Sequence, residues 1–444
     1  MSRRAEAKGK QHMTTVSKTG MAGAALAGLA LSGVALLGIT GPAAAQDVSF
    51  KGKTVNLIIT SGTGGSVDLL ARIGARHLGP HLPGSPTVIP RNRGGAGGIV
   101  GANYIYDQAK KDGTELGSSL NSIPFAPLFY GQKKSKATFD ATKFNWIASP
   151  VKFVAVSVAW HTSKIKKWQD LREHQMIVGS SGAGSSGTID GQLLNALMGF
   201  KYKIIIGYPS GGDTDLAMIR GEIEGRVTTA WAGLTSRYPQ WLKDKTVTLL
   251  YQMGLEKYPG MPAEVPLLID HVEDPTNKAA LALKMTAYDI GYPIYAPPGT
   301  PANIVATLRK AYTDTYKDPK LLAEAKKARV DIEPISGEKV AKMVADAYAA
   351  PEPVKELLRT AINSPQKLEK VKTVKVATTL TGIQKKGRVV AFENKGKAQT
   401  AKVAKKTKIT VGGKAAKADA LKKGMACDVD YWGDGSQIKT INCK

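Results

Sequence analysis

Three loops rich in glycine and hydroxyl side chains each follow a short apolar run and precede a helical pattern. They span residues 61–65, 179–187 and 207–212. Backbone N–H groups at a helix N-terminus are unpaired and carry partial positive charge, glycine lets a ligand approach them closely, and serine or threonine adds donors. One such loop is more often a simple turn, but three of them in one chain predict the binding of a small anion.

The composition of these loops favours a carboxylate over a phosphate. None of the three contains Lys or Arg, which phosphate sites usually recruit. The phosphate-binding pattern Gly-x4-Gly-Lys-Ser/Thr is absent from the sequence. Residues 182–187 match Gly-x-Gly-x-x-Gly, but the next strand ends near Ile206 without the acidic residue that would bind a ribose. We therefore expect a carboxylate rather than a dinucleotide.

Catalytic and metal-binding patterns are scarce. The sequence contains neither Gly-x-Ser-x-Gly nor His-Glu-x-x-His. His77 and His81 are four residues apart, but the Gly-Pro pair between them is expected to end the helix. Ser181 or Ser185 could act as a nucleophile, yet no obvious base accompanies them. We expect no enzyme activity, metal or cofactor, and an exported serine-dependent enzyme stays an alternative.

Alternating strands and helices between residues 53 and 240 must position the loops. Runs at 55–60, 176–178 and 204–206 predict strands, and apolar residues at helical spacing follow each of them. Such units form a parallel or mostly parallel sheet, and ligands bind at the carboxyl ends of its strands. Residues 301–363 are largely helical in pattern. The chain is therefore predicted to be an α/β protein.

The N-terminus has the pattern of an export signal. Residues 21–40 are uncharged, five basic residues precede them, and small residues at 43–45 follow. This order predicts a signal peptide over residues 1–45, cleaved near Ala45, and a periplasmic protein. A membrane anchor is the alternative, because about 20 apolar residues can span a bilayer. The sequence leaves open whether export is general or twin-arginine, and whether Met1 or Met13 is the start.

Positive charge is concentrated at the C-terminus. The chain has 62 Lys and Arg against 36 Asp and Glu, a net charge of +26, and residues 365–444 alone hold 19 basic and 6 acidic groups. The strong basicity therefore belongs mainly to this tail. Because the chain is expected to be exported and the tail has few aromatic residues for base stacking, we expect no nucleic-acid partner.

The tail reads as a small all-β module over residues 381–444, antiparallel in pattern, which follows a basic linker over 365–380. Glycine turns separate its alternating segments. Cys427 and Cys443 are a disulfide candidate in an oxidising compartment, with two unpaired thiols as the alternative. The tail either keeps the protein soluble or docks it onto an anionic envelope surface. In the second case the chain could be an envelope-associated adhesion protein.

The motifs of residues 50–363, in this order, resemble those of the Bug-type or TctC-type solute-binding proteins, the extracytoplasmic receptors of tripartite tricarboxylate transporters. The matching motifs are residues 63–72, 92–98, 111–114, 181–185, 208–212, 220–222, 258–262 and 296–301. Each motif is short, so their order and spacing carry the resemblance. Gly94 and Thr188 depart from the family pattern, where proline and often histidine stand, and the basic tail extends beyond the usual end of the family.

The resemblance implies a two-lobed, type II-like Venus-flytrap fold, with lobe one at about 46–159 and 286–364 and lobe two at about 160–285. It also implies that an organic carboxylate is held between the lobes and delivered to the permease subunits of a membrane transporter. We expect the receptor to be a monomer. The resemblance implies these ligand-binding residues: Thr63, Gly64, Gly65, Asp68, Asn121, Ser122, Ser181, Gly184, Ser185, Tyr208, Gly211 and Trp231. For Asp68 a cap at the start of the helix is the alternative role, and for Trp231 a place in the apolar core. Which carboxylate is bound is left open.

Overall fold

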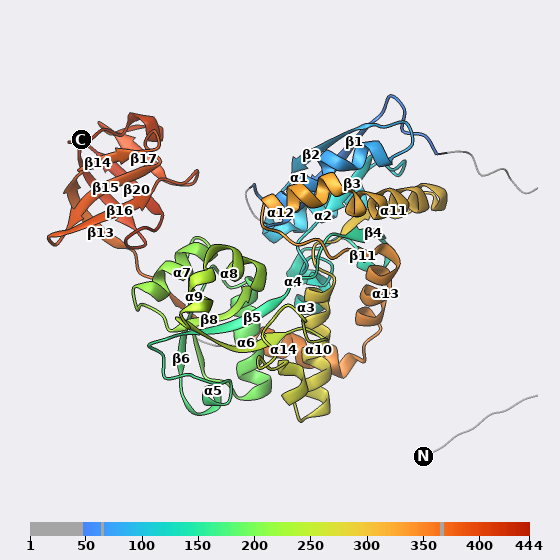
Figure 1. Cartoon of the computed structure of the whole chain (residues 1–444), viewed down its shortest axis with the longest axis horizontal. Helices are drawn as coiled ribbons and strands as arrows, with labels where there is room; N and C mark the ends of the chain where they lie inside the picture. Colours follow the sequence, from blue (N-terminus) through green and yellow to red (C-terminus); the bar gives the residue numbers. More distant parts are fainter. Residues whose placement is uncertain (1–47, 64–65, 365–367) are drawn as a thin grey trace, which may run out of the picture. The chain divides into compact units, whose positions relative to one another are not determined.

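The computed structural model describes residues 48–63, 66–364 and 368–444. They form two six-stranded sheets with helices packed on them, and a strand-rich C-terminal region (Figure 1). The first sheet has the order β11-β4-β10-β3-β1-β2. β1 pairs in parallel with the edge strand β2 and with β3, whereas β10 runs antiparallel to β3 and β4. The strands are β1 (Thr54–Ile59), β2 (Thr87–Asn92), β3 (Glu115–Ser118), β4 (Asn145–Ser149), β10 (Ile294–Ala296) and β11 (Ile335–Ser336).

The second sheet has the order β12-β7-β6-β8-β5-β9. β6 pairs in parallel with β7 and β8, and β5 pairs antiparallel with β8 and β9. β5 lies ahead of the lobe boundary expected near residue 160, and β12 comes from the segment expected to be a linker. The strands are β5 (Ala155–Trp160), β6 (Met176–Ser180), β7 (Tyr202–Ile206), β8 (Gly225–Ala230), β9 (Val247–Met253) and β12 (Glu369–Lys370).

Amphipathic helices cover both sheets, as their apolar spacing predicts. α1 buries Val67, Leu70, Ile73 and Leu78 on one face, and it packs against α11 and α12. The helices are α1 (Ser66–Leu78), α2 (Ile99–Asp107), α3 (Ala126–Tyr130), α4 (Gln132–Ser135), α5 (Asp170–Glu173), α6 (Ser186–Met198), α7 (Gly211–Ile219), α8 (Trp231–Arg237), α9 (Pro239–Lys243), α10 (Pro275–Asp289), α11 (Ala302–Lys317), α12 (Pro319–Lys327), α13 (Gly337–Tyr348) and α14 (Glu352–Ile362). Within the described residues, no helix combines the length and the apolar character that a membrane span requires.

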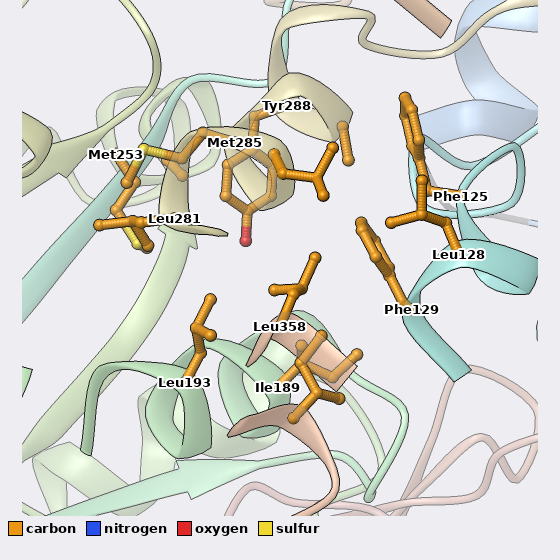
Figure 2. Close-up of a cluster of buried hydrophobic side chains, with 14 of the residues drawn as sticks. Phe125, Leu128, Phe129, Ile189, Leu193, Met253, Leu281, Met285, Tyr288 and Leu358 are labelled. Carbon is orange, nitrogen blue, oxygen red and sulfur yellow. The ribbon is translucent and has the colours of Figure 1, made fainter. Parts of the chain in front are cut away.

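The helix α14 packs against α3, α6 and α10. Figure 2 shows Leu358 of α14 near Ile189 and Leu193 of α6, with Phe129 of α3 and Met285 of α10 in the same cluster. These side chains come from distant parts of the sequence and are almost completely buried. Burying a side chain of this size stabilises the fold by about 1.5–3 kcal/mol, so α14 is a structural part of this core.

A buried ion pair lies beside this cluster. Nζ of Lys284 on α10 is 2.9 Å from Oδ1 of Asp190 on α6. Thr228 Oγ1 donates to Oδ2 of the same carboxylate over 2.5 Å, and the Tyr288 hydroxyl donates to it as well. Burial and the neighbouring Asp190 charge raise the pKa of Tyr288. The buried Asp190 carboxylate thus has one ammonium group and two hydroxyl groups as partners. Such partners offset the cost of removing a charge from water.

The C-terminal module is all-β, as predicted. β13, β19, β20, β17 and β18 form one sheet, and β14, β15 and β16 form another. β17 and β20 are parallel, unlike the antiparallel pattern expected, because they are not joined by a hairpin but paired across the module. Cys427 and Cys443, on neighbouring strands, form a disulfide. The strands are β13 (Val374–Thr379), β14 (Gly382–Gln384), β15 (Val389–Asn394), β16 (Lys397–Lys402), β17 (Lys408–Val411), β18 (Lys414–Ala415), β19 (Ala426–Tyr431) and β20 (Ile438–Cys443).

Candidate ligand-binding site

The second glycine-rich loop is held in shape by its own hydroxyl groups. It connects the end of β6 to the start of α6. The Ser185 hydroxyl lies 2.7 Å from the Gly182 carbonyl and 2.5 Å from the Ser180 hydroxyl. Thr188 Oγ1 donates to the same Gly182 carbonyl over 2.8 Å. Thr188 therefore holds the loop from the first turn of α6.

The third loop is tied directly to the second. The backbone amides of Gly207 and Tyr208 both donate to the Ser180 carbonyl, over 3.0 and 3.2 Å. Gly207 has φ +105°, a conformation that favours glycine. Ser210 caps α7, because its Oγ accepts a hydrogen bond from the Asp213 amide over 3.3 Å. The two loops and the N-termini of α6 and α7 thus meet at the carboxyl ends of β6 and β7, as the strand–loop–helix pattern predicted.

A cavity of about 240 Å³ opens beside these two loops. Its walls combine backbone of glycine-rich turns, hydroxyl groups, one aromatic ring and two guanidinium groups. The lining residues are Phe153, Gly179, Ser180, Ser181, Ser185, Ser186, Gly187, Gly211, Thr214, Arg226, Thr228, Thr229, Ala230 and Arg237. Among the predicted site residues, the structure thus brings together Ser181, Ser185 and Gly211. The donors in this wall suit an anionic or strongly polar ligand.

The two arginines were missed by the sequence analysis. Arg226 lies on β8 and Arg237 ends α8, so neither belongs to a glycine-rich loop. The signal that could have found them is a fourth strand and helix, in which β8 ends in Thr228, Thr229 and Ala230 immediately before α8. Its strand end is not rich in glycine, and it therefore lacks the pattern by which the other loops were recognised.

The first loop belongs to the other sheet and is anchored by a polar network. Asn92 Nδ2 donates to the Ser61 carbonyl over 3.1 Å and to Oδ1 of Asp68 over 2.8 Å. Arg72 Nε donates to the same Asp68 oxygen over 2.9 Å. Asp68 is only 5% exposed, and its carboxylate holds Asn92, which in turn binds the loop carbonyl of Ser61. Thr63, in contrast, is exposed on the loop.

Several other predicted residues lie elsewhere. Gly64 and Gly65 lie outside the described residues, and Gly184 is on the exposed part of the second loop. Asn121 is buried and Ser122 half-buried, in the turn that follows β3. Gly184, Asn121 and Ser122 do not line the cavity described above.

The two aromatic residues of the predicted set pack in an apolar cluster instead of lining the cavity. Tyr208 is 2% exposed, and burial raises the pKa of its hydroxyl to about 12. Trp231 is half-buried against the same cluster. Tyr208 belongs to the third loop and Trp231 begins α8, and both rings lose contact with water by packing into this cluster.

Each of the two histidines four residues apart has a carboxylate partner. Nε2 of His77 is 2.8 Å from Glu324, and Nε2 of His81 is 3.2 Å from Asp318. α1 ends at Leu78, as the Gly-Pro pair predicts. Among the described residues, no three His, Cys, Asp or Glu side chains gather as a metal site would need.

Comparison with known proteins supports the resemblance seen in the sequence. A model of the tripartite tricarboxylate transporter family receptor, TctC, matches residues 71–358. A UPF0065 protein of Bordetella bronchiseptica is 26% identical over 282 residues, which cover 62% of this chain and 77% of that protein.

Solved structures support the predicted fold. A TctC solute-binding protein from Polaromonas has a TM-score of 0.55 and 20% identity, over 70% of this chain and 100% of its own. A protein from R. palustris solved with adipate has a TM-score of 0.51 and 18% identity, over 69% of this chain and 97% of its own. The predicted periplasmic-binding-protein fold with an added all-β module is confirmed. The chain therefore belongs to the TctC family of solute-binding receptors.

Proposed function

We propose that this protein captures an organic carboxylate and delivers it to the membrane subunits of a tripartite tricarboxylate-type transporter. The observation that carries the proposal is the composition of the cavity wall. Hydroxyls, glycine backbone and the guanidinium groups of Arg226 and Arg237 line it, and none of its described lining residues is acidic. The adipate bound to the R. palustris protein is a ligand of the same chemical class.

The ligand carboxylate is held by the donors at the start of α6 and around it. Ser181 is exposed at the cavity, and Ser186 and Gly187 begin the helix whose unpaired amides carry partial positive charge. The first loop, on the other sheet, supplies the opposite wall when the lobes close on the ligand. Binding and closure without a chemical step fit a receptor that releases its ligand unchanged.

A serine-dependent reaction has less support. The Ser185 hydroxyl is engaged with the Gly182 carbonyl and the Ser180 hydroxyl, so it helps to hold the loop. No imidazole or carboxylate occurs among the described residues that line the cavity, and a serine nucleophile needs such a base.

We further propose that the protein works in the periplasm after cleavage near Ala45. Residues 1–45 lie outside the described residues, so the sequence pattern and the family carry this proposal. Intact-mass measurement of the exported protein tests it. A mass that includes residues 1–45 would favour a membrane anchor instead.

Ligand screening tests the main proposal. The exported protein is titrated with dicarboxylates, tricarboxylates, aromatic acids and amino acids while its thermal unfolding is followed. A ligand present at 100 times its dissociation constant should stabilise the fold by about 2.7 kcal/mol. Stabilisation by one carboxylate class supports the proposal. A panel without any stabilising carboxylate, on protein refolded to remove bound molecules, would count against it.

A glycine pair in the second loop links the binding to this cavity. A Cβ at Gly187 would lie 3.1 Å from Ser180 Oγ, whereas a Cβ at Gly184 would meet no atom within 4 Å. Gly187→Val should therefore weaken carboxylate binding at least tenfold, about 1.4 kcal/mol, while Gly184→Ala keeps the affinity. Equal affinities of both variants for the carboxylate would place the site elsewhere.

We also propose a second function: the C-terminal module docks the protein on an anionic envelope surface. This proposal is supported by a surface hollow of about 620 Å³ on the module. Lys385, Lys386, Arg388 and Lys417 line the hollow together with one acidic residue, Asp419. Each basic group near an anionic membrane surface contributes about 1 kcal/mol.

Vesicle sedimentation tests the docking. The full protein should bind phosphatidylglycerol-containing vesicles at low salt and leave phosphatidylcholine vesicles free. Lys385→Glu with Lys386→Glu should abolish this binding, whereas the charge-matched pair Lys422→Glu and Lys423→Glu, which is exposed outside the hollow, should reduce it only partly. Equal loss in both pairs would show that net charge, and not the hollow, drives the binding.

A further inference from the structure

Two arginines and one aspartate form a charge cluster at the wall of the cavity. Nη1 of Arg226 is 2.7 Å from Oδ1 of Asp215, and Nη2 of Arg237 is 3.5 Å from Oδ2 of the same carboxylate. The Asp215 side chain is 4% exposed and lies on α7, whereas both arginines reach the cavity. The cluster holds two positive charges against one negative charge, which leaves one positive charge at the cavity.

The neighbouring ionisable groups do not remove this excess charge. Asp213, also on α7, accepts hydrogen bonds from Ser210 and Gln437, and among the described residues it forms no ion pair with either arginine and does not line the cavity. Burial and the Asp215 charge raise the pKa of the Tyr238 hydroxyl to about 12, so it is neutral near pH 7. Asp190 is paired with Lys284.

The guanidinium groups keep donors for a ligand. Nη1 of Arg226 donates to Asp215, and Nε of Arg237 donates to the Gly233 carbonyl over 3.2 Å. Among the described residues, Nη2 of Arg226 and Nη1 of Arg237 have no hydrogen-bond partner. A Cβ at Gly211 would lie 3.3 Å from Nη2 of Arg226, so this free donor borders the third loop, where the cavity opens.

We propose that Arg226 and Arg237 form a subsite for a second carboxylate, with Asp215 as the group that positions Arg226. The proposal rests on the proposed function, in which the first carboxylate binds near the start of α6. Guanidinium and carboxylate match in planar geometry and can share two hydrogen bonds. The protein should therefore bind a dicarboxylate more tightly than the monocarboxylate of equal carbon number, since only the first ligand fills both subsites.

Charge-matched variants test this subsite. Arg237→Gln removes the excess positive charge but keeps the Arg226–Asp215 pair, so the preference for dicarboxylates should fall at least tenfold. Asp215→Asn with Arg226→Gln removes one charge of each sign, which avoids an unpaired buried charge and keeps the excess charge on Arg237. This double variant should retain part of the preference. Lys243→Gln removes an exposed charge of the neighbouring helix α9 outside the cavity lining and should leave the preference unchanged.

The measurement is calorimetric titration with the dicarboxylates from malonate to adipate, each against its monocarboxylate. Circular dichroism and thermal unfolding confirm that each variant is folded. A wild-type protein that binds both ligand types equally, or an Arg237→Gln variant that loses affinity for both types equally, would refute the subsite while the proposed function stands. A protein that binds no carboxylate at all would refute both.

Discussion

The backbone amide of Gln437 donates to Oδ1 of Asp213 over 3.1 Å, and its side-chain amide reaches Oδ2 over 3.2 Å. Asp213 belongs to the first turn of α7, beside the third glycine-rich loop. At the other end of α7, Arg220 donates to the carbonyls of Trp432 and Asp434. The turn between β19 and β20 thus contacts both ends of the helix that follows a ligand loop. The module is therefore attached by side-chain contacts as well as by the chain.

This contact predicts a selective effect of substitution at Gly433. The residue has φ +103°, and a Cβ there would lie 2.9 Å from Cζ of Arg220. Gly433→Ala should displace the turn from α7, and hydrogen exchange should then speed up in both segments. Gly424→Ala is the control, because Gly424 has φ +91° but open space around its Cβ. Equal exchange in the two variants would show that backbone strain alone is responsible.

Removal of the Lys284 charge should destabilise the fold strongly. Lys284→Ala leaves the Asp190 carboxylate buried without its ion-pair partner, which costs about 3–5 kcal/mol. Lys310→Ala removes an exposed ion pair with Asp314 and should cost less than about 1 kcal/mol. Urea unfolding measures both free energies. If the added change Asp190→Asn recovers none of the loss, the cost comes from lost packing and not from the unpaired charge.

The disulfide should stabilise the module and leave the solute-binding part largely unaffected. Cys427 and Cys443 are 16 residues apart in sequence, and closing a loop of this length stabilises a fold by about 3 kcal/mol. Cys427→Ser with Cys443→Ser should lower the temperature at which the module unfolds. Carboxylate binding should persist in this variant. Proteolysis at rising temperature, with fragment masses, separates the two parts, and simultaneous cleavage of both would contradict the prediction.

Asp289 should make stability depend on pH. Burial raises the pKa of this carboxyl above its ordinary value of 3.8, against the opposing effect of Lys152. An acid with a raised folded-state pKa contributes its full stability below the unfolded pKa and loses it as the pH rises through the folded pKa. Asp289→Asn should therefore raise the melting temperature near pH 7 and change it little near pH 3. The same rise at both pH values would show that charge is not the cause.

Local patterns in the sequence determined much of this protein. The glycine-rich loops that follow β-branched runs predicted where β1, β6 and β7 end. This was possible because the spacing of apolar residues that distinguishes strands from helices is a local property of the sequence. The same loops brought Ser181, Ser185 and Gly211 to the cavity, since parallel strands end at one edge of a sheet. The charge distribution, the alternating segments and the two cysteines of the tail likewise predicted a basic all-β module with a disulfide.

Only the tertiary structure decided the features that depend on distant pairing. Arg226 and Arg237 reach the cavity because β8 lies between β5 and β6, an order that no local pattern contains. Tyr208 and Trp231 enter the apolar cluster because their environment is set by the elements that cover them. Likewise, β12 joins the edge of the second sheet at β7, and Gln437 meets Asp213 across more than half the length of the chain. Such contacts follow from packing between elements, which one sequence read locally does not specify.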